Sequence, residues 1–553
     1  MLFRSLRTKK SSNQKRARKA EFETLGQRIV LSANSATGEC PEALVEQQGS
    51  VVFISGSDED DFVRVDLGTN EHTINVNGEV QTFDAAAVDE IVVDGQGGTD
   101  EVNVVGSSLD DRIEVIMDEL ELTSEEYTVR VTESEIVRAL GGEGNDTARI
   151  EDSEGDDELY THPTFSTLVN SDNQIFKVSG VDRVEAFARH GGQDLVRFFD
   201  SPEDDNFVAR AVSSDGNDRG FAFLIGDDFW NFASGFERVD AVSQNGGQDE
   251  ARLFDSPGDD ILVARPDSVV FEAGPSLLVT RGFFSTRTIA EEGGNDTAEL
   301  HGQDFYEDKF VWQDNSSYIY STGNADPNAP PQVDLPAPII ASNLAIGFDH
   351  IEGFGGDDAD RAELRGSTGD DFVLALPEVV QLTTPNADVE AWDFRIVRSL
   401  GRGGTDRAQL QDSVANETYI SNSRFAYLEG PDYLNYVEGF SIDVFATSGG
   451  NDFANAQEYT GPNQDYLIFD GNQFLIWGPN REERIHDFND ARGDGVGPAG
   501  FQLLDQITHA FTLGGSHDQT DLPDEDTAND IVERSEELIT LYEIVDGEIV
   551  EVV

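Results

Sequence analysis

The feature that most constrains the fold is a long passage that occurs twice. Residues 191–211 read GGQDLVRFFDSPEDDNFVARA and residues 246–266 read GGQDEARLFDSPGDDILVARP, and 14 of the 21 positions are identical. The two copies begin 55 residues apart. A chain that repeats an acidic, glycine-rich passage over such a distance indicates stacked copies of one supersecondary unit.

Alignment on the aspartate of a Gly-Gly-x-Asp turn extends the repeat to eight copies. Successive aspartates are separated by 46, 48, 55, 47, 62, 48 and 46 residues, and the longest interval contains a proline-rich insertion at 324–338 that predicts a surface loop. The array therefore consists of about eight units of similar length over residues 41–475. The aligned aspartates are Asp100, Asp146, Asp194, Asp249, Asp296, Asp358, Asp406 and Asp452.

Each unit reads as short strands joined by tight turns. Runs such as VDRVEAFA and LVRFFDS are rich in Val, Phe and Leu and are bounded by Gly, Asp and Pro, which is typical of β-structure. Three or four such strands per unit predict an all-β repeat protein, a parallel β-solenoid of the β-helix or β-roll type. A β-propeller is the alternative, because its blades carry four strands.

A second acidic turn follows the first in five units. Stacking of equivalent turns would place Asp194 over Asp249 and Asp205 over Asp260, about 4.8 Å apart. Two carboxylates at that distance repel by roughly 3 kcal/mol at an effective dielectric constant of 20. Raised pKa values, neighbouring arginines or bound cations would relieve this repulsion. The second-turn aspartates are Asp111, Asp157, Asp205, Asp260 and Asp371.

These turns offer oxygen ligands, which suit Ca²⁺ better than zinc or copper. We therefore expect calcium at the turns as the cofactor. The structural alternative is that the same Asp, Asn and Ser side chains cap backbone N–H groups at the corners. The expected metal ligands are Asp100, Asp146, Asp157, Asp194, Asp205, Asp249, Asp260, Asp296, Asp371, Asp406 and Asp452.

One turn also resembles a known calcium-binding family. The stretch GGEGNDTAR at 141–149 is similar to the GGxGxDxUx nonapeptide of repeats-in-toxin proteins, and GQGGTDEVN and GRGGTDRAQ resemble its looser form. The resemblance implies a parallel β-roll or β-helix whose turns chelate calcium through Asp and backbone carbonyls. The nonapeptides here are not in tandem, so neighbouring ligands would come from adjacent coils or from the second turn.

The N-terminal segment, residues 1–40, differs in charge from the rest. Its first 28 residues hold nine basic and two acidic side chains and lack the apolar core of an ordinary signal peptide. FETLGQRIVLSA at 22–33 resembles the FExLExRxLLSA leader of planctomycete-type surface proteins, with Gly26 where that leader has Glu. The resemblance implies export to the cell surface or the extracellular space. A basic tail for nucleic acid is the alternative.

The other 525 residues carry 28 basic and 107 acidic side chains, a net charge of −79. Such a body repels nucleic acid and attracts cations, and adaptation to salt would give the same balance of charges.

Cys40 is the single cysteine, so no intrachain disulfide can form. No stretch approaches the roughly 20 apolar residues that a membrane helix needs.

Catalytic motifs are absent from the sequence. Eight scattered histidines form no HExxH pair, and no GxSxG elbow occurs. The acidic pairs recur from unit to unit, whereas an enzyme has a single set of catalytic residues, so we expect no enzyme.

The predicted function is that of an exported structural, adhesive or matrix-binding protein whose partners are matrix, polysaccharide or surface proteins. A carbohydrate-active β-helix enzyme and a propeller-type binding module are the alternatives. Residues 476–553 form a C-terminal segment or cap.

Overall fold

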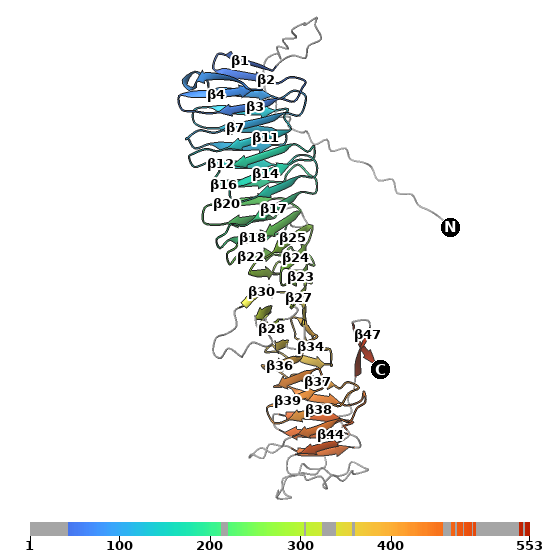
Figure 1. Ribbon diagram of the computed structural model, residues 1–553. Coiled ribbons are helices and arrows are strands. Elements are labelled where there is room, and N and C mark those ends of the chain that lie inside the picture. The colour runs from blue at the N-terminus through green and yellow to red at the C-terminus, as the bar shows by residue number, and fades with distance from the viewer. Residues whose placement is uncertain are drawn as a thin grey trace, which may run out of the picture.

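The computed structural model shows an all-β, elongated stack of strands (Figure 1). The N-terminal leader, the proline-rich insertion and Asp358 lie outside the residues that the structure describes. The described ranges are 43–211, 219–303, 306–322, 339–356, 360–456, 466–470, 473–478, 481–488, 490–493, 541–545 and 548–552.

Two sheets, A and B, run along the whole stack and face each other across the core. Sheet A contains 23 described strands. In spatial order they are β1 (Leu44–Gln48), β2 (Val51–Ser55), β6 (Glu90–Asp94), β10 (Thr128–Thr132), β9 (Glu119–Thr123), β8 (Arg112–Ile116), β12 (Thr147–Glu151), β16 (Arg183–Phe187), β20 (Trp230–Ser234), β19 (Phe221–Ile225), β18 (Asn206–Arg210), β22 (Glu250–Phe254), β26 (Ser285–Ile289), β30 (Ile339–Ile346), β29 (Ser316–Thr322), β28 (Glu307–Gln313), β32 (Arg361–Arg365), β36 (Ile396–Leu400), β40 (Leu434–Glu438), β39 (Phe425–Glu429), β38 (Thr418–Ser421), β42 (Phe453–Ala456) and β46 (Asp490–Gly493).

Sheet B is built in the same way. In spatial order its described strands are β5 (Glu79–Asp84), β4 (Glu71–Val76), β3 (Phe62–Asp66), β7 (Glu101–Val105), β11 (Ile136–Leu140), β15 (Ile175–Ser179), β14 (Phe165–Val169), β13 (Glu158–Thr161), β17 (Leu195–Phe199), β21 (Arg238–Val242), β25 (Ser276–Arg281), β24 (Ser268–Ala273), β23 (Ile261–Arg265), β27 (Thr297–His301), β31 (His350–Phe354), β35 (Asp388–Trp392), β34 (Val379–Thr383), β33 (Phe372–Ala375), β37 (Arg407–Gln411), β41 (Ser441–Phe445), β45 (Arg481–His486), β44 (Gln473–Gly478) and β43 (Tyr466–Asp470).

The strand pairings establish a solenoid rather than a propeller. Most neighbouring strands are parallel, as β12 and β16 are, and each sheet runs from one end of the stack to the other. The predicted parallel β-solenoid is therefore confirmed, and the propeller alternative is wrong. Outside the two sheets lie the hairpin of β47 (Leu541–Val545) and β48 (Glu548–Val552) and the 3₁₀ turn η1 (Ala85–Ala87). Strands β45 and β46 still pair with the stack.

One sequence repeat corresponds to five strands, rather than the predicted three or four. Three of them form an antiparallel meander within a single sheet, and the other two lie in the opposite sheet. The meander β13–β14–β15 lies in sheet B, and the next one, β18–β19–β20, lies in sheet A. Successive repeats thus exchange the roles of the two sheets.

The core follows from the two-residue period of the strands. In β12, Ala148 and Ile150 point inward and are buried, while their neighbours on the strand alternate outward. Parallel register then stacks like residues, so that Ile54, Val93 and Val131 form one buried column. Burial of each such side chain stabilises the fold by about 1.5–3 kcal/mol. One apolar cluster extends from Val52 to Ile485 and holds the turns at the two sheet edges.

Candidate cation-binding turns

Each Gly-Gly-x-Asp turn stacks on the second acidic turn of the preceding repeat. The backbone N–H of Asp157 donates to Oδ1 of Asp194 at 3.0 Å, and that of Asp205 donates to Oδ1 of Asp249 at 2.8 Å. The predicted stacking of Asp194 on Asp249, and of Asp205 on Asp260, is wrong. The turn of Asp194 leads from sheet A to sheet B, whereas the turn of Asp249 leads from B to A, because successive repeats exchange sheets.

The same pairing accounts for the other predicted ligands. Each first-turn carboxylate accepts the backbone N–H of the second-turn residue one coil away, over 2.7–3.0 Å. The structure therefore pairs each predicted residue with an acid on an adjacent coil, although two of these partners, Asp61 and Glu417, were not predicted. The further pairs, donor first, are Asp61 with Asp100, Asp111 with Asp146, Asp260 with Asp296, Asp371 with Asp406, and Glu417 with Asp452.

In one repeat, the first-turn aspartate lies two residues later than the sequence predicted. Asp358 lies outside the described residues, and Asp360 occupies the first-turn position directly before β32. Its Oδ1 accepts the N–H of Asp308 at 2.8 Å. Two additional residues between the glycine pair and the strand therefore make Asp360, and not Asp358, the equivalent aspartate. Alignment on the residue directly before the strand, rather than on the glycine pair, would have identified Asp360 from the sequence.

In most repeats, the residue before the second-turn acid forms a hydrogen bond in the opposite direction. Oδ1 of Asp156 accepts the N–H of Gln193 at 2.8 Å, and Oδ1 of Asp204 accepts the N–H of Gln248 at 2.7 Å. The two turns thus hydrogen-bond each other in both directions. We did not predict these residues, although the Asp-Asp pair in the repeated passage marks them. The further acceptors are Asp60, Asp110, Asp259, Asp370 and Asn416.

A serine four residues earlier fixes the second-turn carboxylate. The N–H of Ser153 donates to Oδ2 of Asp157 at 2.6 Å, and its hydroxyl donates to Oδ1 at 2.8 Å. Ser256 binds Asp260 in the same way. Most carboxylate oxygens therefore cap backbone N–H groups at the corners, which is the structural alternative that the sequence left open.

At several of these corners, carboxylates from three successive coils lie one above another along the stack. The N–H of Asp194 donates to Oε2 of Glu237 at 2.9 Å, which extends the Asp157–Asp194 pair by one rung. Burial, followed by repulsion from neighbouring acids, raises the pKa of Asp194 to about 7. The pKa values of Asp100, Asp146 and Asp296 are raised to about 6 for the same reasons. Burial first, and neighbouring acids next, also raise the pKa values of Asp205, Asp249 and Asp406.

Two turn clusters bring three carboxylates within 4.8 Å of one another. The first contains Asp152, Asp157 and Asp194, all buried. Asp152 accepts the N–H groups of Arg189 and His190 at 2.8 Å, and the Nδ1 atom of His190 lies 2.8 Å from it. This cluster therefore already receives several hydrogen bonds.

The second cluster contains Asp412, Glu417 and Asp452 and is less well satisfied. Oε2 of Glu417 and the hydroxyl of Tyr433 are buried and have no hydrogen-bond partner. Burial raises the pKa of Glu417 to about 7, and the neighbouring Asp452 and Asp412 add to the shift. Burial and these three acids also raise the pKa of Tyr433. Buried polar atoms without hydrogen-bond partners favour a bound cation or a shared proton.

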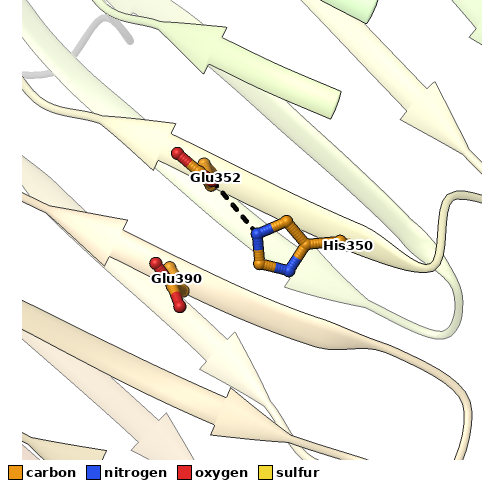
Figure 2. Close-up of side chains that lie close together, drawn as sticks. All are labelled: His350, Glu352 and Glu390. Atoms are coloured by element: carbon orange, nitrogen blue, oxygen red, sulfur yellow. Dashed lines mark hydrogen bonds and ion pairs between the residues drawn. The ribbon is translucent and has the colours of Figure 1, made fainter. Parts of the chain in front are cut away.

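A third group lies on the outer face of sheet B, at the start of β31 and next to the corner that contains Asp349. His350 and Glu352 on β31 face Glu390 on β35, with Nε2 of His350 3.1 Å from Oε1 of Glu352 (Figure 2). The hydrogen bond to Glu352 raises the pKa of His350. We did not predict this group, although the alternation His-x-Glu places both side chains on one face of a strand.

Comparison with protein-family profiles and with curated proteins finds no match. Among the described residues, no helix has the length and apolar character needed to cross a membrane.

Proposed function

We propose that the chain is an exported structural protein with an adhesive or matrix-binding role and no catalytic activity. Its acids recur at the same corners of successive repeats and hydrogen-bond the backbone of adjacent coils, as Asp157 and Asp194 do. Acids that recur in every repeat and hold adjacent coils together are expected in a stiff, rod-shaped structural protein rather than in an active site. Export rests on the leader-like stretch at 22–33.

We further propose that Ca²⁺ binds at the turn clusters and stiffens the stack. The observation that carries this proposal is the Asp412–Glu417–Asp452 cluster, where Oε2 of Glu417 and the hydroxyl of Tyr433 lack hydrogen bonds. Hard oxygen ligands of this kind suit Ca²⁺. The well-capped turns, such as that of Asp260, would contribute structure rather than ligands.

The charge of the body favours particular partners. A net charge of −72 on the whole chain disfavours nucleic acid and favours contact with matrix polysaccharide or surface proteins, directly or through bridging cations. A rod with two long sheet faces offers such partners an extended surface.

Thermal melting of the full chain tests the calcium proposal. We expect millimolar CaCl₂ to raise the melting temperature of the EDTA-treated protein by several degrees, and MgCl₂ to raise it less, because Ca²⁺ tolerates irregular oxygen coordination. Glu417→Gln should remove a measurable part of the calcium-induced rise. Glu429→Gln, which removes the same charge from an exposed side chain in the same repeat, should leave it unchanged.

The comparison is between melting temperatures with and without calcium for each variant, so a change in basal stability does not obscure it. An identical rise in the wild type and in Glu417→Gln would place calcium elsewhere. No rise in the wild type would reject calcium stabilisation altogether.

A further inference from the structure

Three glutamates stand side by side across the outer face of sheet B. Glu299 on β27 is in register with Glu352 on β31, which is in register with Glu390 on β35. Like charges directly opposite each other on neighbouring strands destabilise a sheet. This row therefore needs a source of positive charge.

Arginine supplies that charge elsewhere on sheet B. The carboxylate of Asp240 lies 3.0 Å from Arg197, 3.0 Å from Arg238 and 3.6 Å from Arg281, so cations on three strands surround one acid. In the glutamate row, the ion pairs found within the described chain are to histidines. They join His301 to Glu299 at 3.3 Å and His350 to Glu352 at 3.1 Å.

The side chains around His350 also have the spacing of a chelating group. One ligand atom from each of His350, Glu352 and Glu390 lies within 4.8 Å of the others (Figure 2). Trp392 donates to Oε2 of Glu390 at 2.9 Å, and Gln381 donates to Oε1 at 3.2 Å. These hydrogen bonds come from β34 and from further along β35, and they orient the Glu390 carboxylate as hydrogen bonds to metal-bound carboxylates do.

We propose that His350, Glu352 and Glu390 bind a first-row divalent transition-metal ion of the Zn²⁺ class. One imidazole nitrogen with two carboxylates is a donor set that suits zinc, whereas Ca²⁺ takes oxygen ligands alone. The side chains of His350 and Glu352 are 33% and 31% exposed, so solvent can reach the site and fill the remaining positions. The ion would cross-link β31 and β35 and neutralise the centre of the glutamate row.

Calorimetric titration of the full, EDTA-stripped chain with ZnCl₂ tests this site. Excess CaCl₂ is present throughout, so that the acidic turns are screened and the outcome does not depend on the calcium proposal. We expect His350→Gln and Glu390→Gln each to weaken Zn²⁺ binding about tenfold or more. His301→Gln is the matched control, because it removes the neighbouring histidine of a similar His–Glu pair, and it should leave the affinity unchanged.

Equal Zn²⁺ affinity in the wild type and in His350→Gln would overturn the proposal, as would an equal loss in His301→Gln. Melting curves without metal establish that the variants fold. If His350→Gln does not fold, Co²⁺-loaded wild-type protein decides the question by NMR. Hyperfine-shifted imidazole C–H resonances assigned to His350 support the site, and their absence at saturating Co²⁺ overturns it.

Discussion

At the scale of single residues, the glycines of the first turn set how closely two coils can approach. Gly192 has a φ of +122°, and a Cβ atom there would lie 2.2 Å from the carbonyl oxygen of Gly155 on the adjacent coil. Gly247 is in the same position, with a Cβ distance of 2.3 Å to the oxygen of Glu203. The second glycine of each pair is therefore required both for its conformation and for the contact between turns.

Substitution of the two glycines of one turn separates these requirements. Gly192→Ala should lower the free energy of unfolding more than Gly191→Ala, whose φ of +102° is also unfavourable but whose Cβ would meet no atom within 4 Å. We expect about 1–3 kcal/mol for Gly191→Ala from backbone strain alone, and a larger loss for Gly192→Ala. Denaturant unfolding measures both, and equal losses would show that the contact between turns contributes nothing.

The turn carboxyls also predict how stability depends on pH. The pKa of Asp194 is raised to about 7, and those of Asp100, Asp146 and Asp296 to about 6, so the folded state holds these protons more tightly than the unfolded chain does. Their protonation therefore stabilises the fold, and this stabilisation is lost as the pH rises through 6 to 7.

We expect the melting temperature in EDTA to rise as the pH is lowered from 8 to 5. Below about pH 4 it should fall again, because the pKa of Asp240 is lowered by Arg238 and Arg197 against the effect of burial, and that carboxylate must stay charged. Asp194→Asn should flatten part of the rise between pH 8 and 5. A melting temperature that falls over that interval would contradict the assignment.

At the scale of strands and turns, the sequence determined the units but not their arrangement. Alternating apolar residues, as in β12, predicted strands with one buried face, and the Gly-Gly-x-Asp turns predicted a solenoid. The meander could not be deduced in the same way, because each hairpin steps back along the stack and changes which turns become neighbours. Local signs were present, such as Asn77 and Gly78 between β4 and β5, where both residues have positive φ.

The candidate sites show the same limit. Capping of Asp157 by Ser153 is a local interaction over four residues and was within reach of the sequence. The cluster of Asp412, Glu417 and Asp452 joins two coils, and the group around His350 joins two strands that are 38 residues apart in register. Such sites depend on register between coils, which no local pattern specifies.

At the scale of the whole molecule, the exchange of sheets makes every repeat equivalent to its neighbours. A repeat contributes five strands to two sheets, or two and a half rungs, which corresponds to roughly 12 Å of rod length at 4.8 Å per rung. Asp146 and Asp194 occupy equivalent positions, since each accepts a second-turn N–H and donates to an acid one coil further along.

Deletion of residues 147–194 should therefore leave a folded rod. The deletion joins Asp146 to Leu195, so the first turn at the junction stays complete. Every strand after the junction then lies in the opposite sheet, and these strands keep their pairings with one another. We expect small-angle scattering to show a maximum dimension shorter by roughly 12 Å, with little change in the unfolding midpoint. Deletion of residues 147–169 removes half a repeat, leaves meander strand β15 without β14, and should abolish cooperative unfolding. If both deletions were equally harmful, the repeats would not be interchangeable, and the stack would depend instead on the particular sequence of each repeat.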